Sequence, residues 1–138
     1  MGHSALGVSR LIGALVEASH DKEGIVWPAV IAPYQILILP VAAPSPDPPA
    51  PSPITLSMAL YDSLSASPSF ARDVLIDDRI EQQTSQRIKH GQLMGIPWTI
   101  LVTPSAVEDS HVEVEARRTG EKLGYTSSPC IVVDPGRR

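Results

Sequence analysis

The sequence predicts an α/β domain with three layers, in which a mixed sheet of about five strands has helices on both faces. Short uncharged runs at residues 35–39, 74–76 and 98–102 are typical of strands in the interior of a sheet. Residues 54–65 and 82–92 lie between these runs and have helical composition or spacing. Strands and helices therefore alternate along the chain, as they do in α/β domains.

Length and charge limit what the chain can be. Its 138 residues suffice for one domain with appendages, and its net charge of −4 gives no general attraction to phosphate backbones. Any contact with RNA must then be local and specific. A single cysteine, Cys130, excludes an internal disulfide and fits a reducing compartment such as the cytoplasm or the mitochondrial matrix.

The uncharged residues 25–43 approach the roughly 20 residues that a membrane helix needs. Three prolines interrupt this segment, namely Pro28, Pro33 and Pro40. Each removes a helical hydrogen bond, so we expect turns and a strand here and no contact with a membrane. Glu17 and Asp21 also argue against a mitochondrial presequence, which normally lacks acidic residues.

A helix near the N-terminus is predicted by apolar residues at helical spacing, which are Leu11, Ile12, Leu15 and Val16. We expect Ser9 to begin this helix and Gly24 to end it in a left-handed conformation. The following segment, which contains Trp27 and Tyr34, leads in extended conformation to the first strand at residues 35–39.

Residues 42–53 form a proline-rich stretch, for which we favour a semi-rigid surface insertion. Its Pro46–Pro49 pattern also fits a weak SH3-ligand motif, without the flanking arginine that would support it. Helical spacing resumes with the leucines at positions 56, 60 and 64.

The strand at residues 74–76 ends abruptly at three charged residues, Asp77, Asp78 and Arg79. A helix within residues 82–92 and a strand at 98–102 follow, which makes a strand–helix–strand unit with a parallel, right-handed crossover. We expect function at the charged end of this first strand.

Toward the C-terminus, residues 112–115 alternate apolar and acidic side chains, as a strand with one wet face does. Residues 117–122 predict a turn into a further strand or a frayed end. Residues 130–133 could add a short edge strand, and we expect the tail after them to be disordered.

These patterns resemble class II aminoacyl-tRNA synthetases, and the prolyl-tRNA synthetases most closely. The order Asp77-Asp78-Arg79, helix, Gly95-Ile96-Pro97 and strand carries the resemblance, together with Trp27-Pro28 and Ala32-Pro33-Tyr34 in the connector. The first twelve residues also look like motif 3 of that family. The resemblance covers residues 1–123. It implies a remnant of the catalytic domain with its connector at 1–28, an anticodon-binding domain at 29–125 with an insertion at 42–53, and a tail at 126–138.

By this resemblance, Gly7, Ser9 and Arg10 correspond to the motif 3 residues that contact ATP. Motifs 1 and 2 are absent from the chain, so we expect no aminoacylation by these 138 residues alone. The resemblance implies that the full-length enzyme uses ATP and forms a homodimer through its catalytic domain. In this chain by itself, we expect Arg10 to be solvated.

Proline codons begin with two cytidines, so the matching tRNA carries two adjacent guanines in its anticodon. Carboxylates can accept from the N1–H and N2–H groups of guanine, while arginine or lysine donates to O6 and N7. The residues expected to contact the anticodon are Asp78, Arg79, Glu81, Arg87 and Lys89. The alternative for individual residues is structural, because Asp77 can cap the helix or pair with Arg79, and Arg87 and Lys89 can form a solvated face.

Two other functions stay open. The chain could be a free-standing adaptor that binds RNA or protein without chemistry, or a receiver-like module that binds a cation at Asp77 and Asp78. The second lacks an acidic residue at the end of the next strand, where Val102-Thr103-Pro104 stands. The histidines are too scattered for a metal motif, so we expect no metal site.

Overall fold

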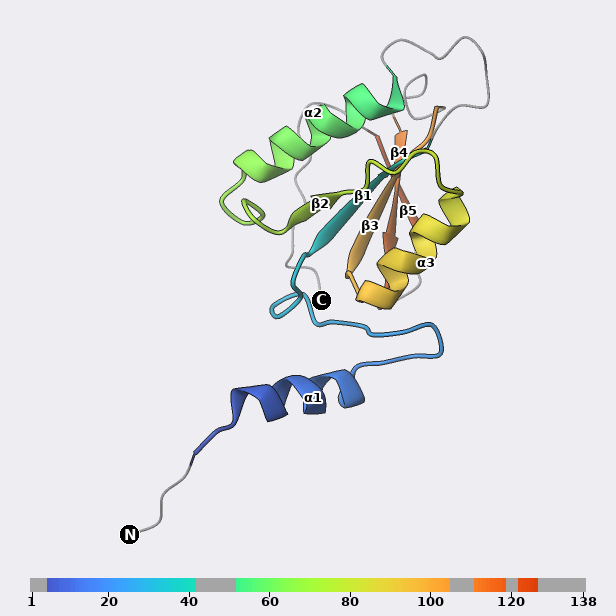
Figure 1. The fold of residues 1–138 in the computed structure, drawn as a ribbon. Coiled ribbons are helices and arrows are strands. Elements are labelled where there is room, and N and C mark those ends of the chain that lie inside the picture. The colour runs from blue at the N-terminus through green and yellow to red at the C-terminus, as the bar shows by residue number, and fades with distance from the viewer. Residues whose placement is uncertain (1–4, 42–51, 105–110, 119–121, 127–138) are drawn as a thin grey trace.

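A computed structural model of the protein describes residues 5–41, 52–104, 111–118 and 122–126 (Figure 1). The described helices and strands are α1 (Val8–Ala18), β1 (Ile36–Pro40), α2 (Pro53–Ala66), β2 (Val74–Ile76), α3 (Thr84–Met94), β3 (Trp98–Val102), β4 (His111–Ala116) and β5 (Lys122–Thr126).

The strands form a five-stranded mixed sheet in the order β2-β1-β3-β4-β5. β2 and β3 both run parallel to β1, which lies between them, whereas β4 and β5 join antiparallel. In this register Ile38 of β1 lies between Ile76 and Ile100. The prediction of a mixed sheet of about five strands is confirmed, and the carboxyl ends of β1, β2 and β3 share one edge.

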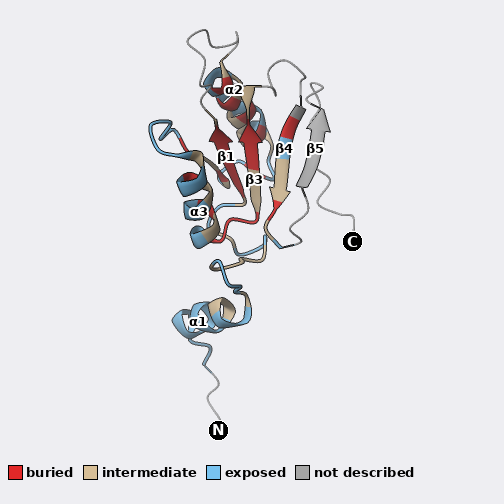
Figure 2. Cartoon of the chain, turned by 90° about the vertical axis from the view of Figure 1, so that its right-hand side faces the viewer, coloured by how far each residue is buried: buried red, intermediate tan, exposed pale blue. Residues whose placement is uncertain are grey.

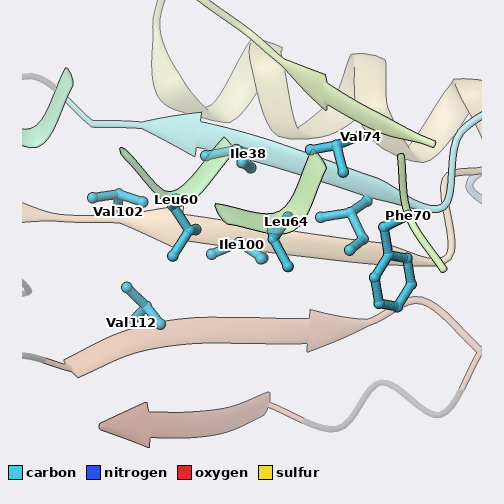
Figure 3. Close-up of a cluster of buried hydrophobic side chains, with 9 residues drawn as sticks. Ile38, Leu60, Leu64, Phe70, Val74, Ile100, Val102 and Val112 are labelled. Atoms are coloured by element: carbon cyan, nitrogen blue, oxygen red, sulfur yellow. The ribbon is translucent and has the colours of Figure 1, made fainter. Parts of the chain in front are cut away.

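The two faces of β1 belong to two separate cores. On one face, Ile36 and Ile38 pack with Leu60 and Leu64 of α2, as Figure 3 shows for most of this cluster. The alternating residues of β1, Leu37 and Leu39, lie on the other face of the sheet. They pack there with Ile96 and with Ile88 of α3. Each large apolar side chain buried here contributes about 1.5–3 kcal/mol. Helices therefore cover both faces of the sheet, as predicted.

Two glycines let α3 fit closely against its neighbours. A Cβ at Gly91 would lie 2.5 Å from Leu37 Cδ2, so the missing side chain allows the helix to approach the sheet. Gly95 ends the helix with φ +74°, and its N–H donates to the carbonyl oxygens of Gly91 and Gln92.

The start of the chain differs from the prediction. α1 begins at Val8 with Gly7 at its N-cap, so Ser9 is already inside the helix. The helix ends at Ala18, and Gly24 does not terminate it. Gly24 instead adopts φ +147° in a turn where the Asp21 carboxylate accepts from the N–H groups of residues 23 and 24. An antiparallel bridge pairs His20 with Ile25, so the chain has already left the helix and turned back around Gly24.

α1 lies apart from the sheet and has no buried residue (Figures 1 and 2). Its apolar residues, such as Leu11 and Ile12, are exposed. Within the described ranges, none of the helices has the length and apolar character to cross a membrane. The expected surface insertion, apart from residues 52 and 53, and the expected edge strand at 130–133 lie outside the described residues, whereas the expected further strand is β5.

Candidate functional site

The charged residues predicted to carry function lie at the carboxyl edge of β1 and β2, beside the first turns of α3. Asp77 follows β2 directly, and its N–H donates to the carbonyl oxygen of Ile38 at 3.0 Å. The Asp77 carboxylate is buried, although it stands at the end of a three-residue strand. A buried charge at this position needs partners, and two arginines supply them.

Arg87 is the inner of these two arginines and is 1% exposed. Its Nη1 donates to the carbonyl oxygen of Pro40 at 2.7 Å, and its Nη2 donates to the carbonyl oxygen of Asp77. Its Nε lies 3.4 Å from Asp77 Oδ1, close enough for charge attraction, yet it has no hydrogen-bond partner among the described residues. Arg87 thus joins the carboxyl ends of β1 and β2.

This burial corrects the expectation that Arg87 contacts the anticodon. A guanidinium held between two backbone carbonyls under the strand ends has no surface to offer a base. For Arg87 the alternative of a solvated face is wrong for the same reason, whereas Lys89, the other residue of that alternative, is exposed. Arg87 and Gly91 are four residues apart and both buried, so they share the inner face of α3, and that spacing was the signal available in the sequence.

Arg79 is the outer arginine, with a side chain that is 42% exposed. Its Nε and Nη2 donate to the two oxygens of the Asp77 carboxylate at 3.1 and 2.8 Å, and its backbone N–H donates to Oδ1 at 3.0 Å. One edge of the Arg79 guanidinium is therefore fixed, while much of the side chain stays accessible. The predicted alternative of an Asp77–Arg79 pair is present in the structure.

These contacts shift the titration of both partners. Hydrogen bonds from the Arg79 side chain, then its backbone N–H and the charge of Arg87, lower the pKa of Asp77 from 3.8 to about 2 despite burial. The hydrogen bond to Asp77 raises the pKa of Arg79. Asp77 is ionised near neutral pH and bound to both arginines, which argues against a cation site there.

The other predicted contacts, Asp78, Glu81 and Lys89, are all exposed. Asp78 lies close enough to Arg79 for its charge to raise the pKa of that arginine. Lys89 lines a shallow depression with Gln92, Leu93 and, from the connector, Glu23. The structure thus brings Asp78 and Arg79 together, whereas Lys89 faces the connector side of α3.

His90 lies beside this group and was missed in the sequence. Its Nδ1 is 3.2 Å from Nη1 of Arg79, so the histidine contacts the part of the guanidinium that Asp77 does not hold. His90 comes three residues after Arg87 on α3. This helical spacing was the only feature of the sequence that indicated a place for His90 near the charged residues.

The N-terminal candidates form no such group. Gly7 precedes α1, Ser9 and Arg10 lie in its first turn, and all three are exposed. The Arg10 side chain folds back to within 3.7 Å of a Cβ built at Gly7, and it makes no hydrogen bond or ion pair with any other described residue. This agrees with the expectation that Arg10 is solvated in this chain.

Arg117, at the end of β4, forms a second arginine cluster that the sequence did not predict. Its Nη1 donates to Glu23 Oε2 at 2.9 Å and its Nη2 donates to Asp21 Oδ1 at 2.7 Å. Nearby, Trp27 Nε1 donates to the carbonyl oxygen of Met94 at 3.0 Å. We call these contacts of Arg117 and Trp27 the connector clasp, because they hold residues 20–27 against the end of α3.

The described residues contain no group of three or more histidine, cysteine or acidic side chains placed to hold a metal ion. After β3 come Thr103 and Pro104, neither of which is acidic. The geometry at the strand ends therefore offers hydrogen-bond donors and acceptors of both charges, as recognition of a polar ligand requires.

Comparison with known proteins decides which family this arrangement belongs to. The sequence pattern of a family described as "Anticodon binding domain" matches residues 35–128, most of the chain. The chain belongs to the anticodon-binding domain family. The match includes the whole sheet, α2, α3 and every residue of the site at the strand ends, but neither α1 nor the connector.

Curated relatives of this anticodon-binding domain are proline--tRNA ligases. That of Acidiphilium cryptum is 40% identical over 122 residues, 88% of this chain and 25% of the relative. That of Gluconobacter oxydans is 38% identical over 123 residues, 89% of this chain and 25% of the relative. The chain thus spans about a quarter of the length of these relatives. The predicted resemblance to prolyl-tRNA synthetases is confirmed.

Solved structures agree on the fold. Giardia lamblia prolyl-tRNA synthetase in complex with prolyl-adenylate matches with a TM-score of 0.75 and 21% identity, over 86% of this chain and 24% of that one. Prolyl-tRNA synthetase from Cryptosporidium parvum, complexed with L-proline and AMP, matches with a TM-score of 0.72 and 23% identity, over 84% of this chain and 24% of that one. The fold of the anticodon-binding domain is shared at low sequence identity.

Proposed function

We propose that this chain binds the anticodon of proline tRNA as the C-terminal part of a proline--tRNA ligase. One observation carries the proposal. Asp77, itself buried, holds one edge of the Arg79 guanidinium, while Arg79 stays 42% exposed beside the exposed carboxylate of Asp78. A fixed cation next to an anion is the pairing that the Watson–Crick and Hoogsteen edges of guanine require.

In this proposal, Arg79 donates to O6 or N7 of an unstacked guanine, and Asp78 accepts from its N1–H and N2–H groups. Glu81 offers a further acceptor in the same loop, and Lys89 contacts the RNA from α3. Arg87 makes no RNA contact. It holds the strand ends together and so keeps the Asp77 backbone in place beneath Arg79.

The remaining assignments concern the full-length ligase. We propose that residues 1–28 belong to its catalytic domain and connector, and that Gly7, Ser9 and Arg10 contribute to its ATP site. The prolyl-adenylate and AMP named with the neighbouring structures support ATP use by such an enzyme. A homodimer through the catalytic domain fits the same proposal. The 138-residue chain by itself binds tRNA without attaching proline to it.

The test compares two RNAs and three proteins. Wild-type chain should bind a proline tRNA transcript about tenfold or more tightly than a transcript whose two anticodon guanines are replaced. Arg79→Ala should remove this preference. Arg72→Ala is the matched control, because Arg72 is an exposed arginine that precedes β2 at the opposite end of the strand, and it should keep the preference.

For each protein, the titrations with the two transcripts are made at the same salt concentration, because general attraction to phosphate depends strongly on salt. Equal affinity of the wild type for the two transcripts would overturn the anticodon assignment. Equal loss of preference in Arg72→Ala and Arg79→Ala would show that the site at the strand ends is not responsible.

A further inference from the structure

The contact between His90 and Arg79 depends on the tautomer of the histidine. Arginine has donors only, so the 3.2 Å approach of Nη1 to Nδ1 is a hydrogen bond only if Nδ1 carries no proton. The tautomer with its proton on Nε2 provides this acceptor.

The same contact determines which donors of Arg79 remain. A guanidinium has five N–H groups, one on Nε and two on each terminal nitrogen. Asp77 takes the Nε group and one from Nη2, and His90 takes one from Nη1. One N–H on each terminal nitrogen is left, and these two donors can bind acceptor atoms such as O6 and N7 of guanine.

We propose that His90 is a positioning residue for RNA recognition, which holds the Arg79 guanidinium at Nη1 and so orients its two remaining N–H groups for contact with guanine. This inference rests on the proposed function. Asp77 holds one edge of the guanidinium through two hydrogen bonds, and His90 adds a third contact at Nη1. With both attachments, the plane and the direction of the two free N–H groups are fixed before the RNA arrives, which reduces the entropy lost on binding.

The test uses the ratio of affinities for the proline tRNA transcript and the transcript with replaced guanines. This ratio cancels the general attraction of any cation to phosphate, which both transcripts share. For the wild type, we expect this ratio to be about tenfold or more.

Two substitutions at the exposed position 90 separate the acceptor from the ring. His90→Asn retains an acceptor near the place of Nδ1, so it should keep the preference. His90→Leu has no acceptor, so its preference should be about fivefold lower than that of the wild type, as expected for the loss of one hydrogen bond. Circular dichroism should show that both variants keep the wild-type fold.

An unchanged preference in His90→Leu would overturn the role of His90, as would a loss of preference in His90→Asn equal to that in His90→Leu. If Arg79→Ala removes the preference while His90→Leu keeps it, only the role of His90 fails and the proposed function stands. If Arg79→Ala keeps the preference as well, the proposed function itself fails.

Discussion

Arg87 donates a hydrogen bond across 47 residues of sequence to the carbonyl oxygen of Pro40, at 2.7 Å. The same guanidinium donates to the carbonyl oxygen of Asp77, so one side chain joins the last residue of β1 to the residue that follows β2. Neighbouring parallel strands leave carbonyl groups unpaired where they end, and a fully buried arginine satisfies them here. The floor of the candidate site is thus made by the core of the domain.

Replacing Arg87 should unfold the domain more easily. We expect Arg87→Met to lower the free energy of unfolding by about 3 kcal/mol, because two buried carbonyl groups lose their donor and Asp77 loses a nearby charge. Urea denaturation measures the change. Arg72→Met, at an exposed arginine, should change stability by less than about 0.5 kcal/mol, and equal effects of the two substitutions would contradict the structural role of Arg87.

Asp77 should make the stability depend on pH in the acid range. Its pKa is about 2 in the folded protein against an ordinary value of 3.8, so the unfolded chain binds the proton more readily. The stabilisation is fully present above about pH 5 and is lost as the pH falls through 3.8 toward 2. We expect a loss of about 2 kcal/mol over this interval.

Urea unfolding between about pH 5 and pH 2.5 tests this dependence. Asp77→Asn should be less stable than the wild type at the upper limit, and its stability should fall less as the pH is lowered. The exposed residue Asp78 provides the control, because Asp78→Asn should retain the wild-type slope. A wild-type slope in Asp77→Asn would show that other carboxyl groups cause the acid sensitivity.

Gly95 should not tolerate a side chain. Its φ of +74° strains any other residue, and a Cβ at this position would lie 2.7 Å from the carbonyl oxygen of Ile25. We expect Gly95→Ala to cost about 1–2 kcal/mol of unfolding free energy in urea denaturation. Gly13→Ala is the matched control within α1, where no atom of the described part of the chain contacts the new Cβ within 4 Å outside the helix itself, and it should not destabilise the protein.

The connector clasp should depend on Arg117 and on salt. We expect Arg117→Ala to accelerate hydrogen exchange at the amides of Val26 and Trp27, which donate to the carbonyl oxygens of Ser19 and Gly95. Arg118→Ala, at the exposed neighbouring arginine, should leave both rates unchanged. About 1 M salt should accelerate exchange in the wild type, because both carboxylate partners of Arg117 are partly exposed. Unchanged rates in Arg117→Ala would mean that Trp27 holds the connector without it.

The strands could be predicted closely because a strand that is buried on both faces has a short, uncharged, apolar sequence. The runs at residues 74–76 and 98–102 coincide with β2 and β3, and the first strand is displaced by a single residue. α3 was less sharply predicted, since its polar composition gives no clear stripe and its start depends on a turn in which Gln82 N–H donates to the carbonyl oxygen of Arg79.

The location of the site could be predicted from the sequence, but the role of each residue in it could not. A corner of mixed charge after a buried strand indicates where polar side chains gather, and Asp78 and Arg79 do meet there. Whether Arg87 faces solvent or the strand ends depends on the placement of β1, about which the local sequence says nothing. The role of His90 also depends on the exact direction of the Arg79 guanidinium.

The connector clasp has a consequence for the order in which the protein assembles during its synthesis. Asp21 leaves the ribosome 96 residues ahead of Arg117, its ion-pair partner. At a few to about twenty residues per second, the connector waits several seconds before β4 exists to receive it. During this interval the exposed apolar face of α1 has no anchored orientation, so a nascent chain is most open to chaperones before its last strands emerge.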